Sequence, residues 1–221
     1  MTAVAIFVKT PGLSPIKTRL AKDWGRERAE TWHRLAAASV AASALAANIG
    51  PVYWAIAEPE GMEHSLWSGL PGLNQGSGKL GARMARVLAW LVRHHGSGLL
   101  LGADAPQWNP AWLRQAADWL QAESPRLCLG PARDGGFWAF GANRPLDTVN
   151  WDQIRYSQPE TGQRFRQLMD DQGDWLTLPT LCDLDESQDL PTVLAELEAL
   201  QNHHAAHRCL LAWVRRTQAS K

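Results

Sequence analysis

The sequence has no excess of charge of either sign. Its 22 lysines and arginines balance its 22 aspartates and glutamates, so the formal net charge is zero. Proteins whose main partner is nucleic acid usually carry a basic excess that neutralises phosphate groups, so we expect no nucleic-acid partner. Any site for an anion must therefore be a local feature of the chain.

Long apolar runs and cysteine frameworks are also missing. No stretch approaches the roughly 18 consecutive apolar residues of a membrane span. The first residues lack the basic and apolar regions of a secretion signal, so we expect a cytoplasmic protein without a membrane span. The three cysteines, Cys128, Cys182 and Cys209, are odd in number and far apart. They are typical of reduced cytosolic thiols and match no zinc motif.

The chain does contain enough apolar material for one substantial core. Hydrophobic residues make up 45% of its 221 residues, which is ordinary for a globular protein. The 12 tryptophans are unusual, and most are expected in the core, although one or two could stack on a sugar. No repeat or linker is evident, which favours one domain over residues 1–200. A C-terminal helix in 201–221 would pack on that domain or on a second subunit, which leaves a homodimer open.

Strand-like and helix-like segments alternate along the chain. Short apolar runs predict strands at 3–8, 52–57, 98–102, 127–130, 137–141 and 175–178. Helical spacing predicts helices at 24–48, 80–95, 159–171, 191–200 and 203–216, and a further helix begins at Asn109-Pro110. Such alternation predicts an α/β protein with a mostly parallel sheet that helices cover on both faces.

The loop after the first predicted strand is rich in cations. Residues 9–20 read KTPGLSPIKTRL and include Lys9, Lys17 and Arg19. Ligands of α/β sheets bind beyond the carboxyl ends of the strands, and the prolines limit this loop's freedom. The loop is therefore either a site for a pyrophosphate-bearing ligand or a surface loop with solvated basic residues. No Walker or paired-glycine motif is present to decide between them.

A second glycine-rich segment, QGSGKLGARM at residues 75–84, leads into a predicted helix. The first N–H groups of a helix are free and its dipole favours an anion there. The alternative is a flexible loop that simply precedes a helix.

Acidic residues follow several predicted strands. Asp104 comes directly after the strand at 98–102, where a carboxylate could hold Mg²⁺ or Mn²⁺ or could cap the next turn. Asp134 opens an Asp-Gly-Gly turn, which suits either close approach to a ligand or a plain hairpin. Asp183 and Asp185 would point to opposite faces of an extended chain, so we expect at most one of them beside Asp104.

Five segments, in order, carry a resemblance to a known family. Its patterns FAKxPxxGxxKTRL, QGxGDLGERM, GSDCP and LGPAxDGGY match residues 9–20, 75–84, 102–106 and 129–137, and the late elements DW, LP and DVDTxxDL match Trp151, 178–179 and 183–190. Over nearly its whole length, to about residue 195, the chain resembles the bacterial GT-A-like transferases of DUF2064 type. These are described as radical-SAM/selenodomain-associated or arsenosugar-pathway glycosyltransferases, within the nucleotide-diphospho-sugar transferase superfamily.

The resemblance implies a single-domain, Rossmann-like GT-A fold and a divalent metal, Mg²⁺ or Mn²⁺. It implies that Asp104 and Asp185 hold the metal and that Asp134 and Asp104 are the catalytic acids. The residues that it assigns to a nucleotide or nucleotide-sugar donor are Lys9, Lys17, Arg19, Gln75, Gly76 and Arg83.

Three functions stay open, of which we favour a glycosyltransferase that moves a sugar from an NDP-sugar to a small acceptor. The second is a nucleotidyltransferase that joins an NTP to a small phosphate or alcohol and releases pyrophosphate. The third is a nucleotide-binding module with weakened catalysis. It is motivated by departures from the family pattern: Ser14 replaces a glycine, Lys79 and Ala82 replace acids, and Arg133 stands where an acid is common.

Overall fold

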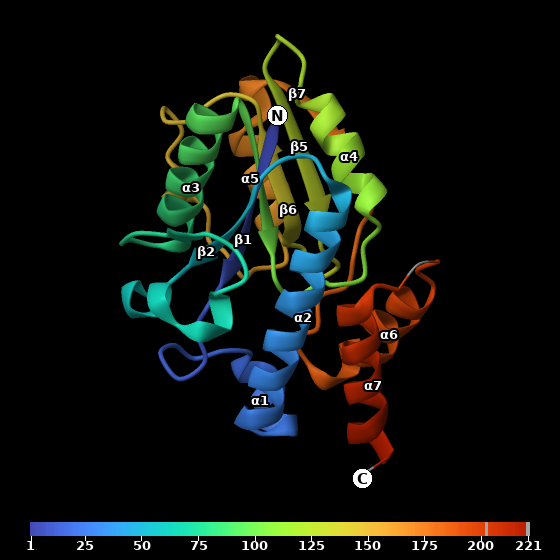
Figure 1. Ribbon diagram of the computed structural model, residues 1–221. Helices are drawn as coiled ribbons and strands as arrows, with labels where there is room; N and C mark the ends of the chain where they lie inside the picture. The colour runs from blue at the N-terminus through green and yellow to red at the C-terminus, as the bar shows by residue number, and fades with distance from the viewer. Residues whose placement is uncertain (202, 220–221) are drawn as a thin grey trace.

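A seven-stranded sheet forms the centre of the computed structural model, which describes residues 1–201 and 203–219 (Figure 1). The strand order is β3-β2-β1-β4-β6-β5-β7. The strands are β1 (Thr2–Val8), β2 (Val52–Ile56), β3 (Gly72–Asn74), β4 (Ser97–Gly102), β5 (Arg126–Pro131), β6 (Phe137–Ala142) and β7 (Asp174–Thr177). Strand β6 is antiparallel to both its neighbours, and the other pairs are parallel. The predicted mostly parallel mixed sheet is therefore confirmed.

Helices cover both faces of this sheet, as predicted. Helices α2 and α4 pack on one face, and α3 and α5 pack on the other (Figure 1). The helices are α1 (Thr18–Trp24), α2 (Arg26–Ala47), α3 (Leu80–His95), α4 (Pro110–Trp119), α5 (Thr161–Leu168), α6 (Leu190–Glu198) and α7 (Ala205–Ala219). None of these described helices is both long and apolar enough to cross a membrane.

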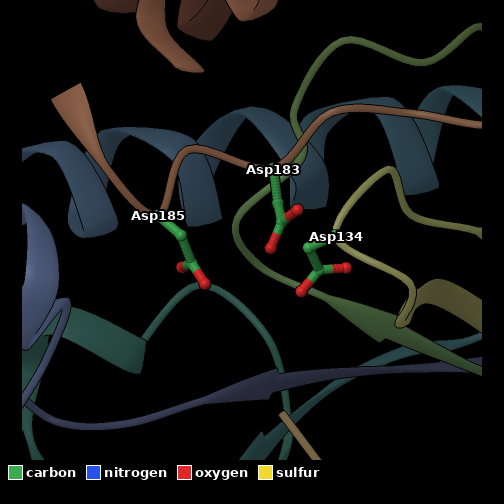
Figure 2. A group of neighbouring side chains, drawn as sticks. All are labelled: Asp134, Asp183 and Asp185. Carbon is green, nitrogen blue, oxygen red and sulfur yellow. The ribbon is translucent and has the colours of Figure 1, made fainter. Parts of the chain in front are cut away.

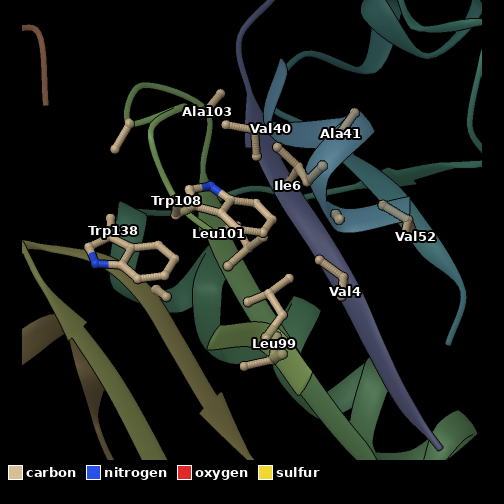
Figure 3. Packing of buried hydrophobic residues seen from close by; sticks show 14 of the residues in the cluster. Val4, Ile6, Val40, Ala41, Val52, Leu99, Leu101, Ala103, Trp108 and Trp138 are labelled. Atoms are coloured by element: carbon tan, nitrogen blue, oxygen red, sulfur yellow. The ribbon is translucent and has the colours of Figure 1, made fainter. Parts of the chain in front are cut away.

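Successive side chains of the central strands point to opposite faces of the sheet, so the core has one part on each face. Val4 and Ile6 of β1 face α2, whereas Ala3 and Ala5 face α3. Both sides of β1 are buried, which is why this strand reads as a continuous apolar run. Figure 3 shows the α2 side, where Trp108 packs among the side chains of β1 and β4.

Two elements differ from the sequence prediction. The helix predicted at 24–48 is α2, but α1 precedes it inside the segment that we expected to be a loop. Gly25 separates the two helices with φ of 79°. Leu20 of α1 is fully buried against α2, α6 and α7, a long-range contact that local periodicity does not reveal. Strand β3 was not predicted, because it has only three residues within a turn-rich stretch.

The C-terminal helices pack beside α1 and α2 (Figure 1). Leu210, Leu211 and Val214 of α7 are buried with Trp32 of α2 and Val193 of α6. The division of the chain at residue 200 stays a prediction, and residues 202 and 220–221 of the predicted C-terminal segment lie outside the described residues.

Replacing a fully buried side chain of β1 should lower stability by the cost of a core cavity. We expect Ile6→Ala to reduce the free energy of unfolding by about 3 kcal/mol. Leu45→Ala removes a comparable side chain that is 55% exposed, and should change it by less than about 0.5 kcal/mol. Denaturant titration of both variants measures the difference. Equal effects would contradict the assignment of β1 to the core.

Candidate functional site

A cleft of about 890 Å³ opens at one edge of the sheet. Every strand except β6 runs in the same direction, so the segments that follow β1, β3, β4, β5 and β7 all emerge at this edge. These segments carry the predicted site residues. Those that line the cleft are Lys9, Lys17, Arg19, Gln75, Arg83, Asp104, Asp134 and Asp185.

The Lys17 ammonium lies between two of the predicted acids. Its Nζ is 3.0 Å from Asp104 Oδ2 and 2.7 Å from Asp185 Oδ1, and its side chain is only 4% exposed. Burial alone would lower the pKa of Lys17, but the two carboxylates outweigh burial and raise its pKa above the usual range. Lys17 therefore stays charged, and it joins the loop after β1 to those after β4 and β7.

The backbone of Lys17 is strained. Its φ of 45° and ψ of 47° lie in the left-handed region, at the residue that precedes α1. This conformation costs a residue other than glycine about 1–2 kcal/mol. The ion pairs with Asp104 and Asp185 hold the side chain in the position that this backbone creates.

Asp104 is held from two sides. Besides Lys17, it contacts Nδ1 of His33, which lies 3.3 Å from Asp104 Oδ1, while His33 Nε2 lies 3.1 Å from the carbonyl oxygen of Lys9. Burial would raise the pKa of Asp104, but Lys17 and His33 bring it well below its usual range. Both nitrogens of His33 thus lie next to oxygen atoms, one from the Asp104 carboxylate and one from the backbone of the loop after β1.

Three carboxylates converge on the same side of the cleft. Ligand oxygens of Asp134, Asp183 and Asp185 all lie within 4.8 Å of one another (Figure 2). The expectation that only one of Asp183 and Asp185 faces the site is wrong, since both line the cleft. Residues 182–185 form no regular strand after the isolated bridge at Leu181, so the strict alternation of a pleated strand does not apply.

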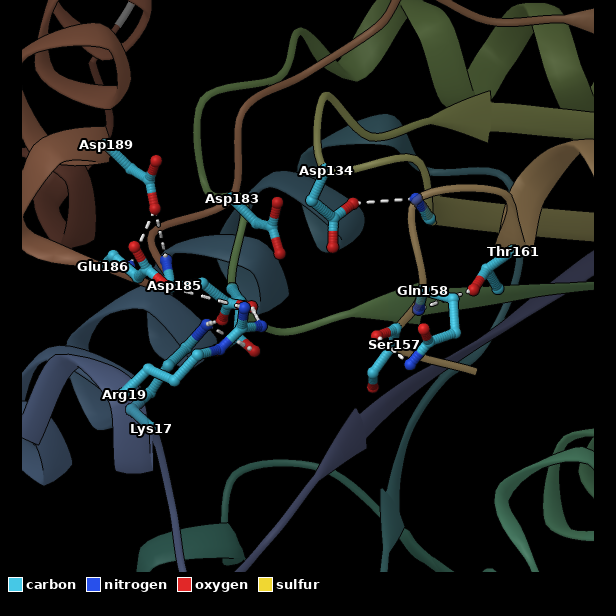
Figure 4. A network of polar contacts seen from close by, with 12 residues as sticks. Lys17, Arg19, Asp134, Ser157, Gln158, Thr161, Asp183, Asp185, Glu186 and Asp189 are labelled. Atoms are coloured by element: carbon cyan, nitrogen blue, oxygen red, sulfur yellow. Dashed lines mark hydrogen bonds and ion pairs between the residues drawn. The ribbon is translucent and has the colours of Figure 1, made fainter. Parts of the chain in front are cut away.

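The three acids have different partners (Figure 4). Asp185 contacts Lys17 and, at 2.5 Å, Arg19, and Asp134 accepts a hydrogen bond from the backbone N–H of Gly136. Among the described residues, the Asp183 carboxylate has neither a hydrogen bond nor an ion pair. Burial and the neighbouring Asp134 raise the pKa of Asp183 to about 7. A cation that entered the cleft would thus benefit this carboxylate most.

Two cations of the cleft have no acidic partner among the described residues. Arg83 donates through Nε to the backbone oxygen of Gly78, and the exposed Lys9 reaches only the carbonyl oxygen of Pro15 at 3.5 Å. Arg19, in contrast, also lies 3.7 Å from Glu186. Lys9 and Arg83 can therefore meet an anion without breaking an existing ion pair.

Hydrogen bonds between side chains and backbone hold the glycine-rich entry to α3 in place. Gln75 is buried and donates through Nε2 to backbone oxygens of β1 and β2, while Gly76, with φ of 77°, does not line the cleft. A Cβ at Gly76 would lie 2.3 Å from Nη1 of Arg86. The N–H of Ala82 donates to Asp152 Oδ1 at 3.1 Å, so one of the first N–H groups of α3, predicted to be free for an anion, already has a partner.

The Asp-Gly-Gly turn is a hairpin, which was one of its two predicted uses, and close approach to a ligand stays a prediction. It joins β5 and β6 as a hairpin and also places Asp134 in the cleft. Gly135 has φ of 87°, and a Cβ there would lie 1.8 Å from the carbonyl oxygen of Pro159. Gly162 donates to the carbonyl oxygen of Gly135 at 2.7 Å, which fixes the turn against the start of α5.

Sequence analysis did not identify His33 and Asp183 as site residues. His33 lies within the alanine-rich helix α2, 71 residues from its partner Asp104, and belongs to no motif. Asp183 could have been found, because it belongs to the same acidic motif as Asp185. Only the assumption of an extended chain set it aside.

Removing the Lys17 charge should destabilise the protein as well as alter the site. Lys17→Met would leave two neighbouring carboxylates without their shared cation, at a cost of about 3 kcal/mol in unfolding free energy. Lys9→Met removes an exposed lysine of the same loop and should cost less than about 0.5 kcal/mol. Denaturant unfolding measures both, and equal values would contradict a structural role for the Lys17 ion pairs.

The raised pKa of Asp183 predicts a pH-dependent effect of Asp183→Asn. Between about pH 4 and pH 7 the folded protein holds this proton and the unfolded chain loses it, so the Asp183 contribution to stability falls as pH rises. We expect Asp183→Asn to raise the melting temperature relative to wild type at pH 8, with little difference at pH 4. The exposed Asp118→Asn on α4 is the control. A pH-independent difference for Asp183→Asn would contradict this account.

Comparison with known families gives a match over more than half of the chain. The family described as "Uncharacterized protein conserved in bacteria (DUF2064)" matches residues 33–158. No curated protein matches the chain.

Solved structures share the fold over nearly the full length. A "putative nucleotide-diphospho-sugar transferase" from Desulfovibrio desulfuricans G20 is 22% identical, covers 99% of this chain and 95% of its own, and has a TM-score of 0.79. A nucleotidyl transferase from Methanothermobacter thermautotroptrophicus is 16% identical, with coverage of 90% and 99% and a TM-score of 0.61. Rv0371c of Mycobacterium tuberculosis H37Rv, in complex with manganese, is 15% identical, with coverage of 90% and 98% and a TM-score of 0.51.

These structures differ in the function given to them, and at such identities they establish the fold alone. The chain belongs to the bacterial family DUF2064 and shares its fold with the structure described as a "putative nucleotide-diphospho-sugar transferase".

Proposed function

We propose that this protein is a metal-dependent transferase that uses a nucleotide-activated donor. The reaction that we favour is glycosyl transfer from an NDP-sugar to a small acceptor. One observation carries the proposal: Asp134, Asp183 and Asp185 converge in a cleft that also holds the cations Lys9 and Arg83. Carboxylates for a metal and free cations for phosphate oxygens are the two groups that a nucleotide diphosphate requires.

The carboxylate group fits a hard divalent ion. All the candidate ligand atoms are oxygens, which suit Mg²⁺ or Mn²⁺, and the Asp183 carboxylate forms no ion pair among the described residues. A protein of the same fold is described as a manganese complex, which supports the choice of ion. When bound, the ion would stabilise negative charge on the phosphate oxygens of the leaving group. We therefore keep Asp185 as a proposed ligand and add Asp134 and Asp183 to it.

Asp104 has a different place in this proposal. Both its oxygens contact nitrogen atoms, from Lys17 and His33, so we assign it the task of holding the Lys17 ammonium. Its role as a metal ligand or catalytic acid stays a prediction. An ammonium fixed between two carboxylates needs little reorganisation when charge develops on a nearby phosphate, which is how preorganised electrostatics accelerate transfer.

The remaining side chains of the cleft have roles that follow from their positions. Arg19 keeps Asp185 oriented, and Lys9 and Arg83 would meet phosphate oxygens of the donor. Asp134, on the exposed β5–β6 turn, would lie near the transferred group. Gln75 and Gly76 shape the backbone beside the donor, and direct contact with the nucleotide stays a prediction for both.

A nucleotidyltransferase is the second candidate. A nucleotidyl transferase shares the fold over 90% of this chain. Lys9 and Arg83, which have no acidic partner among the described residues, would equally suit a triphosphate. The two reactions differ in their products, since glycosyl transfer releases a nucleoside diphosphate and nucleotidyl transfer releases pyrophosphate. A binding module with weakened catalysis would bind nucleotide and release neither product.

Binding of nucleotides to the wild-type protein should depend on the metal and on Asp185. We expect Mn²⁺ to strengthen the binding of at least one NDP-sugar or NTP in calorimetric titrations, and Asp185→Asn to weaken that binding at least tenfold. The exposed Asp118→Asn should bind like wild type. Analysis of the products with the bound nucleotide then identifies the reaction.

A wild-type protein that binds no nucleotide with or without Mn²⁺ would overturn the proposed function. Binding that is unaffected by both Mn²⁺ and Asp185→Asn would retain a nucleotide site but remove the proposed metal centre.

A further inference from the structure

One side chain behind the cleft contacts all three of the acid-bearing segments. Glu196 of α6 accepts hydrogen bonds from Nη2 of Arg133 at 2.7 Å, from Nε2 of Gln107 at 3.1 Å and from the backbone N–H of Cys182 at 3.3 Å. The first bond is to Oε1 and the other two are to Oε2. The carboxylate thus uses both oxygens to join three segments that are distant in sequence.

Each of these contacts lies close to an acid of the cleft. Arg133 directly precedes Asp134, and Cys182 directly precedes Asp183. Gln107 follows Asp104 by three residues. It is buried, and its Nε2 also donates to the carbonyl oxygen of Cys182. A shift of Glu196 would therefore be transmitted to the acids through one to three residues of backbone.

The contact with Arg133 also explains a departure from the family pattern. An acid is common at position 133, and its loss suggested weakened catalysis. In this chain the Arg133 side chain points to Glu196, and an ion pair ties the β5–β6 turn to α6. We find that this residue contributes to the support of the turn.

We propose that Glu196 is a positioning residue that sets the spacing of Asp134 and Asp183. The proposal rests on the proposed function, in which these acids hold a metal. An exposed ion pair alone is worth about 0–1 kcal/mol and would not affect a ligand. Glu196 differs because it is only 22% exposed and has two further contacts. Residues that orient metal ligands from behind typically change metal affinity by about 10–100-fold when they are replaced.

Helix α6 supplies a matched control. Glu198, two residues further along, pairs with Arg215 of α7 at 2.7 Å, and among the described residues it forms no hydrogen bond or ion pair with the cleft segments. Glu196→Ala removes all three contacts. Glu196→Gln and Arg133→Ala remove the ion pair and can retain the contacts of Oε2 with Gln107 and Cys182. Glu198→Ala removes an ion pair of the same helix and leaves the described contacts of the cleft segments in place.

The test measures Mn²⁺ affinity, amide hydrogen exchange and melting temperature on the full chain. We expect Glu196→Ala to weaken Mn²⁺ binding about tenfold and to speed exchange in segments 133–136 and 182–186. For Glu196→Gln and Arg133→Ala we expect Mn²⁺ affinities and exchange rates between those of Glu196→Ala and wild type. Glu198→Ala should match wild type in affinity and in exchange of both segments, whatever its melting temperature.

Equal Mn²⁺ affinity and equal exchange in Glu196→Ala and Glu198→Ala would overturn the positioning role. If Glu196→Ala does not fold, the Mn²⁺ affinity and exchange of Glu196→Gln and Arg133→Ala are compared with those of Glu198→Ala instead, and equal values overturn the role. If wild type binds no Mn²⁺, the proposed metal site has failed, and exchange alone decides about Glu196. Unchanged exchange in both segments would then reject its role, and faster exchange would keep it as a support of these segments.

Discussion

The ion pairs of the Lys17 ammonium with Asp104 and Asp185 hold the cleft together. A charge as buried as this one must be paired, because its separation from water costs several kcal/mol otherwise. The pairing joins the segment after β1 to those after β4 and β7, which are distant in sequence. Its contacts with both acids also offset the strain of the left-handed backbone at Lys17.

The charges of the cleft are unevenly compensated, and this imbalance is the physical reason to expect a cationic ligand. Asp104 and Asp185 have Lys17, His33 and Arg19 as partners. Asp134 and Asp183 form no ion pair among the described residues. Burial and their mutual repulsion raise the pKa of Asp183, and the nearby charge of Lys17 offsets this only in part. The fold thus keeps two carboxylates near each other at a cost that a bound divalent ion would remove.

The sequence predicts the parts of this molecule that depend on local patterns. Helix α3 was predicted at its observed limits, because its apolar face repeats at helical spacing, and β1 and β4 follow from continuous apolar runs. The contacts of His33 and of Glu196 could not be predicted, because each joins segments at least 14 residues apart through side chains that belong to no motif. The prediction for Asp183 was wrong for another reason. It assumed that side chains alternate between two faces, as in a strand, but this segment forms no strand.

The departures from the family pattern weigh less against activity once their surroundings are known. Helix α3 has no acid in its first turn, where negative charge would favour the helix dipole, yet Asp152 accepts a hydrogen bond from its Ala82 N–H. Arg133 likewise has Glu196 as a partner. In both places the negative charge is supplied by another segment of the chain. The departures at Ala82 and Arg133 therefore rearrange charge around the cleft and leave its four carboxylates in place. This removes much of the reason to expect weakened catalysis.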